Sequence, residues 1–366
     1  MKIKHILIVT SEFPPQPGGI GNHAYYLALY LYKNDYTVTV IADQRDVINV
    51  EELAFDANLP FRVERIALKT PRLGMYFNRV VKTMNAFKKA DYVIATGKFS
   101  LWNVAFCSRF YNRKTLAVIH GTEVNFKNGY LKKAVDLALN RFGTIVAVSN
   151  YTSQLVSHLE KDVTVIPNGI EIAQWEAEGL TPARLKGYPV LTTVGRVSTR
   201  KGQLQVISHL PELIKTFPDV HYHCIGIPTE ADAFMAQAKS LSVDSYITFH
   251  GVVDAKILKE MLMATDVFVM LSTESTTGDV EGFGIAILEA NALGIPSIGS
   301  KDCGIEDAIL DGKSGFLIER DNTLAFEAAL FGILEHPEVF KKEAVSWAKT
   351  HSWNAIIKRY IKVIAS

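Results

Sequence analysis

The segment VLTTVGRVSTRKGQ, residues 190–203, decides how the second half of the chain folds. Its apolar start, Val190–Val194, has the length and the β-branched composition of a buried strand, and a glycine with Arg196 closes it. A short loop then leads to Lys201, where the next helical pattern opens. A strand, a short loop and a helix in this order form the unit of a parallel α/β sheet. The segment therefore predicts an α/β fold with two cations beyond the carboxyl end of a strand.

The same alternation of apolar runs and helical patterns extends to both ends of the chain. The expected strands are Ile3–Thr10, Thr37–Ala42, Phe61–Ile66, Asp91–Ala95, Thr115–Ile119, Thr144–Ala147, Val163–Ile166, Val190–Val194, His221–Ile225, Tyr246–His250, Val267–Leu271, Pro296–Gly299 and Gly315–Ile318. Prolines and glycines interrupt the rhythm between Ile172 and Pro189, which we interpret as a linker. We therefore expect two Rossmann-like domains, residues 1–170 and 171–345, followed by a helical segment, 346–366.

The composition is that of a globular protein with room for two cores. The chain has 366 residues, of which 48% are hydrophobic and 21% charged, and a net charge of +1. Residues 1–171 hold 21 Lys and Arg against 14 Asp and Glu, while residues 172–366 hold 18 against 24. The three cysteines have neither metal-ligand nor disulfide spacing, and the N-terminal apolar run is too short for a signal peptide. We expect a cytoplasmic protein without a structural metal.

Arg196 and Lys201 flank a loop at the edge of the sheet where ligands bind in doubly wound folds. Helix N-termini offer free N–H groups to phosphate there, so the two cations would converge on a diphosphate. Surface charges at a turn are the alternative interpretation, because Arg and Lys are common in such loops.

The stretch EGFGIAILE, residues 281–289, shifts the balance toward a binding site. Glu281 lies at the start of a helical pattern and Glu289 lies two turns into it. The glycines let a ligand approach the backbone, and the amides after Glu281 can bind an anion or sugar hydroxyls. A pair of glutamates on a helix surface would be the ordinary alternative. The stretch follows the strand Val267–Leu271, however, so it opens on the same sheet edge as Arg196.

Two further loops follow strands of the first half. Residues 13–21, FPPQPGGIG, carry the adjacent Gly18 and Gly19 but lack the Gly-x-Gly-x-x-Gly pattern, which counts against an NAD-dependent oxidoreductase. His120 follows the strand that ends at Ile119, where a histidine can face a ligand, although a lone histidine more often has a structural role.

Together these residues resemble a family of known proteins, the family 4 retaining glycosyltransferases. Six motifs occur in the family's order: Pro17-Gly18-Gly19, His120-Gly121, Pro167-Asn168-Gly169, Gly195-Arg196 with Lys201-Gly202, Glu281 with Glu289, and Gly294-Ile295-Pro296. The resemblance implies a GT-B fold, in which two Rossmann-like domains face each other across a cleft and the C-terminal helix crosses back to the first domain.

The resemblance also implies a role for each matching residue. Arg196 and Lys201 would neutralise the donor diphosphate, Glu281 would bind the transferred sugar, and His120 would lie near the reacting carbon; these four would be catalytic. The remaining donor contacts would be Gly18, Gly19, Asn168, Val253, Gly282, Phe283, Gly284, Ile285 and Glu289. Neither a metal nor another cofactor is implied. The family's usual glycine pair is Cys303-Gly304 here, which departs from the pattern. The run from Thr276 to Glu281 resembles bacterial phosphatidylinositol mannoside mannosyltransferases and favours GDP-mannose over a UDP-sugar.

Partners and rival functions follow from the same residues. A nucleotide-sugar epimerase or phosphorylase of the same architecture, or a non-catalytic subunit that binds nucleotide sugars, remains as an alternative. Nucleic-acid binding is disfavoured because no basic run occurs. The acceptor would be lipid-linked or a glycan. A helix over residues 73–89 would form either a basic face for an anionic membrane or an ordinary domain helix. Its cations and those before it are Lys69, Arg72, Arg79, Lys82, Lys88 and Lys89.

Overall fold

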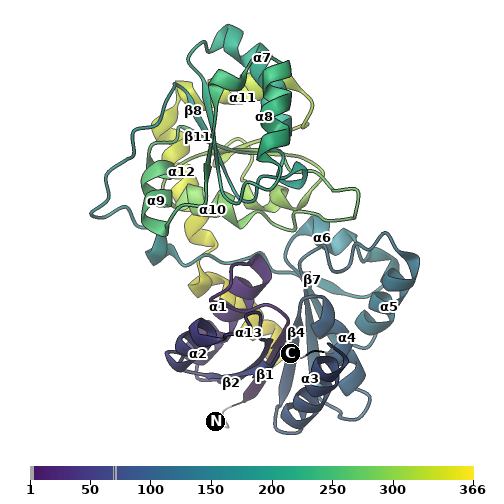
Figure 1. The fold of residues 1–366 in the computed structure, drawn as a ribbon. Coiled ribbons are helices and arrows are strands. Elements are labelled where there is room, and N and C mark those ends of the chain that lie inside the picture. Colours follow the sequence, from purple (N-terminus) through teal and green to yellow (C-terminus); the bar gives the residue numbers. More distant parts are fainter. Residues whose placement is uncertain (1–3, 69, 71) are drawn as a thin grey trace. The chain divides into compact units, whose positions relative to one another are not determined.

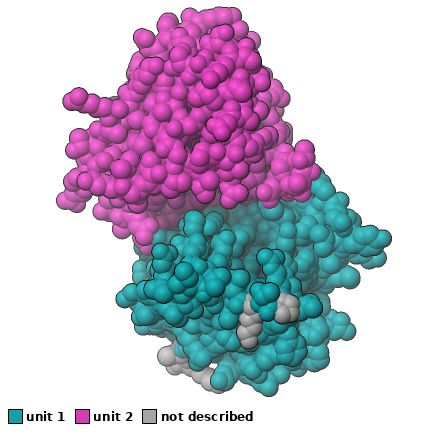
Figure 2. All heavy atoms as spheres, viewed as in Figure 1, with its two compact units in different colours: residues 1–169, 353–366 teal, residues 170–352 magenta. Residues whose placement is uncertain are grey.

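The chain forms two compact units. The computed structural model describes residues 4–68, residue 70 and residues 72–366. The first unit consists of residues 1–169 and 353–366, and the second of residues 170–352 (Figure 2). The sequence placed the two boundaries after residues 170 and 345; the structure places them after Gly169 and Ser352. Each unit contains one sheet with helices packed against it (Figure 1).

The sheet of the first unit has seven parallel strands in the order β3-β2-β1-β4-β5-β6-β7. Their bounds are β1 His5–Thr10, β2 Thr37–Asp43, β3 Arg62–Ile66, β4 Tyr92–Thr96, β5 Lys114–Ile119, β6 Thr144–Ala147 and β7 Val163–Val165. The chain order reverses at β1, which pairs with β2 on one side and with β4 on the other. Central strands such as β4 are buried along their whole length, as expected for a sheet covered on both faces.

The sheet of the second unit has six parallel strands in the order β10-β9-β8-β11-β12-β13. Their bounds are β8 Val190–Val194, β9 His221–Ile225, β10 Ile247–Gly251, β11 Val267–Met270, β12 Ser297–Ser300 and β13 Gly315–Ile318. All thirteen expected strands are therefore present within the described residues; residue Ile3, where the first was expected to begin, lies outside them. In this sheet the chain order of the strands reverses at β8. A doubly wound sheet has its ligand crevice at that point, which is beside Arg196, two residues after β8.

Most helices connect successive strands, and the last three follow the final strand, β13. In the first unit they are α1 Gly19–Lys33, α2 Val50–Ala57, α3 Arg72–Phe87, α4 Lys98–Cys107, α5 Gly129–Leu139, α6 Asn150–Gln154 and α13 Trp353–Ala365. In the second unit they are α7 Gln203–Thr216, α8 Ala231–Ser240, α9 Ala255–Met263, α10 Ile285–Ala292, α11 Thr323–Glu335 and α12 Pro337–Thr350. The apolar residues between helices and sheet form a separate core in each unit.

The C-terminal helix α13 belongs to the first unit, as the resemblance implied. It packs against α1, where the Trp353 ring stacks on Tyr26 and Tyr30. Trp353 and Tyr360 are both fully buried, so these two aromatic side chains anchor α13 to the first unit. That segment was expected to be one helical piece from residue 346, but residues 346–350 end α12 in the second unit.

The basic face, one of the two interpretations of residues 73–89, is not present in the form described above. Arg79 of α3 is buried, and its Nε donates a 2.9 Å hydrogen bond to Asp43. Lys82 donates a 3.0 Å bond from Nζ to the Arg65 carbonyl, and Lys69 lies outside the described residues. The exposed face of α3 instead carries the apolar side chains Leu73 and Phe77, which are 76% and 73% exposed.

Candidate functional site

The corner between β8 and α7 is fastened to the end of β11. The carbonyl of Arg200 accepts a 2.8 Å hydrogen bond from Ser272 Oγ and a 3.0 Å bond from the amide of Thr273. Gly202 makes this approach possible: its φ is +81°, and a Cβ there would lie 2.0 Å from the Leu271 carbonyl oxygen. The local sequence thus fixes the two residues that precede Gly202, Arg200 and Lys201, on the carboxyl edge of the sheet.

Two cations of this corner share one carboxylate oxygen. Lys201 Nζ lies 2.7 Å from Glu281 Oε2, and a guanidinium nitrogen of Arg200 lies 2.5 Å from the same atom. Burial alone would raise the pKa of Glu281, but the charges of Lys201 and Arg200 and their hydrogen bonds lower it to about 2. Glu281 is therefore ionised at every pH at which the protein would be assayed. Residues some 80 positions apart in the sequence, Lys201 and Glu281, are brought together as expected.

Glu289 lies on α10, the helix that begins four residues after Glu281. Burial raises the pKa of Glu289 to about 7, although the nearby charge of Lys201 opposes the shift. Its carboxyl group can therefore donate as well as accept hydrogen bonds near neutral pH, which suits a group that binds a pair of hydroxyls.

Arg196 is the exposed cation of the corner. It forms no ion pair within the described part of the chain, and its carbonyl accepts a 3.1 Å hydrogen bond from Gln203 Nε2, which holds the backbone in place. Its side chain lines a cavity of about 380 Å³. The other walls come from the loops that follow β8, β9 and β11, and they are residues 198–200, 229–230, 274–277 and 279. The cavity is thus polar and lies over the carboxyl ends of three neighbouring strands.

The loop before α10 is hydrogen-bonded to the Cys303-Gly304 segment, which departs from the family pattern. The amide of Gly304 donates a 3.1 Å hydrogen bond to the carbonyl of Glu281, and a Cβ at Gly304 would lie 2.3 Å from that oxygen. Cys303 itself is buried, and its thiol contacts Ser300. Phe283 is also buried, whereas Gly282 and Ile285 are partly exposed and Gly284 forms the N-terminal cap of α10. Val253, which follows β10, is partly exposed.

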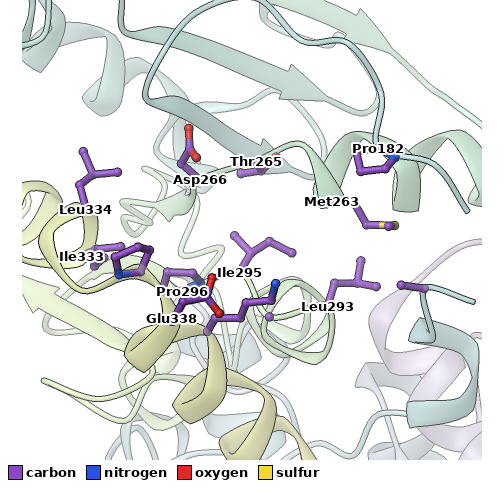
Figure 3. A pocket seen from close by; sticks show the side chains of 14 residues that line it. Pro182, Met263, Thr265, Asp266, Leu293, Ile295, Pro296, Ile333, Leu334 and Glu338 are labelled. Atoms are coloured by element: carbon purple, nitrogen blue, oxygen red, sulfur yellow. The ribbon is translucent and has the colours of Figure 1, made fainter.

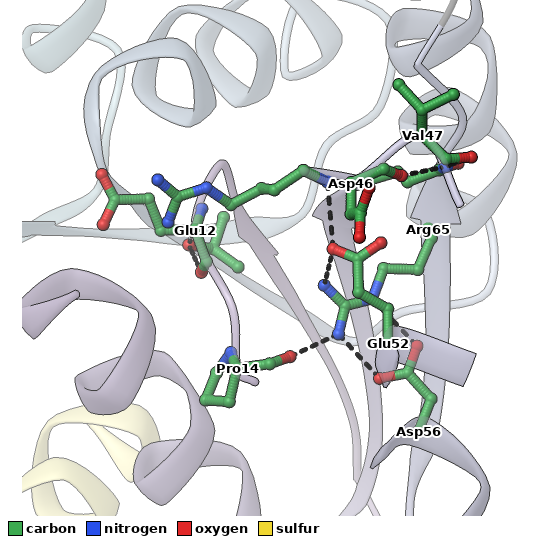
Figure 4. Close-up of polar contacts among 10 residues, drawn as sticks. Glu12, Pro14, Asp46, Val47, Glu52, Asp56 and Arg65 are labelled. Carbon is green, nitrogen blue, oxygen red and sulfur yellow. Dashed lines mark hydrogen bonds and ion pairs between the residues drawn. The ribbon is translucent and has the colours of Figure 1, made fainter. Parts of the chain in front are cut away.

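In the first unit, Gly18 and Gly19 stand at the start of α1. A Cβ at Gly18 would lie 2.6 Å from Glu12 Oε2, so this carboxylate occupies the space beside the glycine, whereas Gly19 faces open space. The loop before them is anchored by Arg65, which donates a 2.5 Å bond to the Pro14 carbonyl (Figure 4). The guanidinium of Arg65 also binds the carboxylates of Glu52 and Asp56.

His120 lies at the end of β5 in a buried polar setting. Its Nε2 is 2.8 Å from Thr96 Oγ1, and its amide donates a 2.5 Å bond to Glu123. Burial lowers the pKa of His120 to about 4, so the ring is neutral near pH 7. Burial raises the pKa of Glu123 to about 7. His23 of α1 stacks edge-on against His120 at 5.0 Å and is held by Tyr360 of α13, whose hydroxyl is 3.0 Å from His23 Nε2.

Asn168 lies between β7 and the end of the first unit. Its Oδ1 is buried and has no hydrogen-bond partner among the residues that the structure describes, and the neighbouring Gly169 packs directly against the Trp353 ring. The structure therefore places Asn168 beside the point where the chain leaves the first unit.

A second cavity of the second unit, about 370 Å³, lies away from these residues (Figure 3). Its lining includes Thr265 and Asp266, which precede β11, and Ile295 and Pro296, which precede β12. It therefore opens at the amino edge of the sheet, opposite to Arg196.

Sequence reasoning missed three residues that the structure adds. Arg200 was passed over as one of several charges in its loop, although it directly precedes Lys201. Glu123 follows His120 by three positions, but nothing in the sequence reveals that it is buried. No feature of the sequence indicates a role for His23, because its partner Tyr360 lies 337 positions away. Among the described residues, no group of three or more His, Cys, Asp and Glu side chains is placed to hold a metal ion.

Comparisons with known proteins agree with this architecture. Residues 181–350 match the family model "Glycosyl transferases group 1", and residues 17–174 match "Glycosyltransferase Family 4". Two Rossmann-like units with these sites at their carboxyl edges define a glycosyltransferase of the GT-B fold. The chain belongs to glycosyltransferase family 4.

Relatives cover nearly the whole chain. A GDP-mannose-dependent alpha-(1-6)-phosphatidylinositol monomannoside mannosyltransferase of Mycolicibacterium smegmatis is 26% identical over 351 residues, 91% of this chain and 90% of the relative. A glycogen synthase of Mycobacterium tuberculosis is 24% identical over 93% of this chain and 88% of its own length. The solved structure of Anabaena Alr3699/HepE in complex with UDP and glucose is similar in fold, with a TM-score of 0.77 at 19% identity over the full length of both chains. A glycosyltransferase from Rickettsia africae gives 0.78 at 21% identity over 99% and 98%.

Proposed function

We propose that the protein is a retaining, metal-independent hexosyltransferase that moves a sugar from a nucleoside diphosphate to a lipid-linked or glycan acceptor. The observation that carries this proposal is the corner at the carboxyl edge of the second sheet, where Arg200 and Lys201 share an oxygen of Glu281 and the exposed Arg196 lines a polar cavity. Fixed cations at this edge suit a leaving group that gains negative charge as its bond to the sugar breaks.

The cations would stabilise the departing diphosphate. Arg196 offers an exposed guanidinium with no ion pair among the described residues, and Lys201 offers an ammonium already oriented by Glu281. Fixed donors of this kind need no reorganisation during the reaction, and removal of one typically lowers the rate by about 10² to 10³. A divalent ion is therefore not required for this role in the proposed mechanism.

Glu281 and the backbone that follows it would bind the hydroxyls of the transferred sugar. With its pKa held at about 2, the Glu281 carboxylate acts as a permanent hydrogen-bond acceptor. Glu289, whose pKa is about 7, would bind the ribose hydroxyls, since it can both donate and accept. His120 is neutral near pH 7 and would contact the donor sugar as a hydrogen-bonding group, not as a cation. Gly18 and Gly19 would bring the backbone of α1 close to the donor.

Retention of configuration would follow from attack on the front face of the sugar. The acceptor hydroxyl would lose its proton to the departing phosphate, so no side chain is needed as a nucleophile. The run from Thr276 to Glu281 and the GDP-mannose-dependent relatives both favour GDP-mannose as the donor, with a UDP-sugar as the second choice.

The proposal is tested by supplying the purified protein with GDP-mannose and a set of UDP-sugars and measuring release of the nucleoside diphosphate. Arg196→Met and Lys201→Met should weaken GDP binding measured by calorimetry, because each removes a charge from the diphosphate site. Glu281→Gln should lose turnover more than GDP affinity, because its carboxylate faces the sugar. Wild-type turnover in all three variants would contradict the assignment of the site, and conversion of the sugar to its epimer would identify the rival enzyme class.

We further propose that the acceptor is approached at a membrane surface through α3. Among the described residues no helix is long and apolar enough to span a bilayer. The exposed Leu73 and Phe77 lie on the same helix as Arg72, and Lys88 follows it. Apolar side chains that insert at the interface, with cations that add about 1 kcal/mol each near anionic lipid, would hold the unit there.

Cosedimentation with phosphatidylglycerol vesicles tests this step. At low salt, the vesicles should bind much less of the double variant Leu73→Ser with Phe77→Ser than of the wild-type protein. Ile48→Ser, a matched change at a side chain of the same unit that is 72% exposed, should leave binding unchanged. Equal sedimentation of all three proteins would favour a soluble glycan acceptor.

A further inference from the structure

Arg200 is the one cation of the β8–α7 corner to which the family motif gives no role. Its side chain is about one quarter exposed, and a guanidinium nitrogen lies 2.5 Å from Glu281 Oε2. The backbone of Arg200 is immobilised by the two hydrogen bonds that its carbonyl accepts from the residues after β11. The side chain of Arg200 thus extends from an anchored backbone and pairs with the Glu281 carboxylate of the candidate donor site.

The Glu281 oxygen that binds Arg200 is the one that binds Lys201. If Lys201 alone paired with Glu281, the two charges would cancel and the ammonium would contribute little to a diphosphate beside it. With Arg200 as a second partner, the three groups keep one net positive charge. Arg196 adds another positive charge, in a cavity that Glu230, Glu274 and Asp279 also line.

We propose that Arg200 is a positioning residue of the donor site, which holds the Glu281 carboxylate so that the Lys201 ammonium can be shared with the donor diphosphate. This inference rests on the proposed function, because it assumes that the corner binds a nucleoside diphosphate. Arg200 acts through Glu281 and does not itself contact the phosphates. The contribution of Arg200 to nucleotide affinity must therefore depend on the charge of residue 281. A residue that binds the phosphates directly would not show this dependence.

The dependence can be measured as a double-mutant cycle with GDP as the probe and UDP in parallel. Arg200→Met removes the charge at similar length and should weaken nucleotide binding by about ten-fold or more, the usual effect of losing a hydrogen bond to a charged group. Arg200→Lys should restore most of the affinity. In the Glu281→Gln background Lys201 no longer has a carboxylate partner, so adding Arg200→Met should change the affinity less than about three-fold.

Arg184→Met serves as the matched control, because Arg184 is an exposed arginine of the same unit and should bind GDP as the wild type does. Thermal unfolding of each variant identifies any loss that comes from misfolding. An equal loss from Arg200→Met in both backgrounds would overturn the inference, since Arg200 would then bind the phosphates directly. Unchanged affinity in Arg200→Met would also overturn it while leaving the proposed function intact. Failure of the wild-type protein to bind either nucleotide would overturn both.

Discussion

Replacement of Gly202 by alanine should disturb both the stability of the second unit and its nucleotide site. The glycine has a φ of +81°, and a Cβ there would lie 2.0 Å from the carbonyl oxygen of Leu271 and 2.2 Å from its carbon. A left-handed backbone costs a residue with a side chain about 1–2 kcal/mol. The contact with Leu271 adds about 1–3 kcal/mol, because the turn must move by roughly an ångström to relieve it.

Gly312→Ala separates these two costs. Gly312 has a similar φ of +71°, but nothing lies within 4 Å of the position that a Cβ would take. Both variants should therefore bear the backbone cost, and only Gly202→Ala should bear the contact. In a domain of this size each kcal/mol lowers the unfolding temperature by about 2–4 °C.

Thermal unfolding followed by circular dichroism, together with GDP titration, measures the outcome. Gly202→Ala should unfold at least about 2 °C below Gly312→Ala and should bind GDP more weakly, because movement of the turn displaces Lys201. Gly312→Ala should keep the wild-type affinity. Equal unfolding temperatures and equal affinities for the two variants would refute the claim that the turn depends on close approach to β11.

Three other predictions test separate features. Transfer should proceed unchanged in the presence of EDTA, because side-chain cations stand where a divalent ion would neutralise the diphosphate; restored activity on adding Mn²⁺ to an inactive, chelated enzyme would contradict this. Burial lowers the pKa of both His223 and His250, whose Nδ1 and Nε2 atoms respectively lie 2.9 Å apart, so below about pH 6.5 the unfolded chain binds protons that the folded chain does not. Their contribution to the free energy of unfolding is complete above that pH and is lost as the pH falls. In urea unfolding between pH 7.5 and 5, His250→Gln should therefore lose less stability than the wild type. The same pH dependence in both proteins would contradict this prediction. Arg79→Met should destabilise the first unit by about 3–5 kcal/mol because it leaves the Asp43 carboxylate buried and unpaired, whereas Arg72→Met, exposed on the same helix, should have little effect in the same urea assay.

The strands could be predicted because the signal for them is local. A run such as Val190–Val194 is apolar, short and β-branched, and in a sheet covered on both faces such a run has few other structures available. The order of strands in each sheet could not be read from the sequence, since apolar runs do not say which neighbour they pair with. The boundary near residue 350 was missed for a related reason: α12 and α13 are both helical, and only packing assigns them to different units.

The helix over residues 73–89 shows where periodicity fails. A helical pattern of cations and apolar residues does not say which face is buried, and the basic face considered for this helix requires Arg79 to be exposed. The structure has the reverse, because Asp43 at the end of β2 supplies a buried partner for the guanidinium. A charge can be buried when a carboxylate from another element satisfies it, and this partner lies 36 positions away in the sequence.

The sequence indicated which residues gather at the carboxyl edge of the second sheet, but not which of their atoms pair with each other. Arg196 and Lys201 were treated as two equivalent cations because both follow the same strand. In the structure Arg196 is exposed and has no ion pair among the described residues, while Lys201 already shares an oxygen of Glu281 with Arg200. The charge that Lys201 can offer to a phosphate is therefore set by two other side chains. A motif specifies which residues meet, whereas the electrostatics of the site depends on which atoms they share, and that information exists only once the corner and the Glu281 loop have folded against each other.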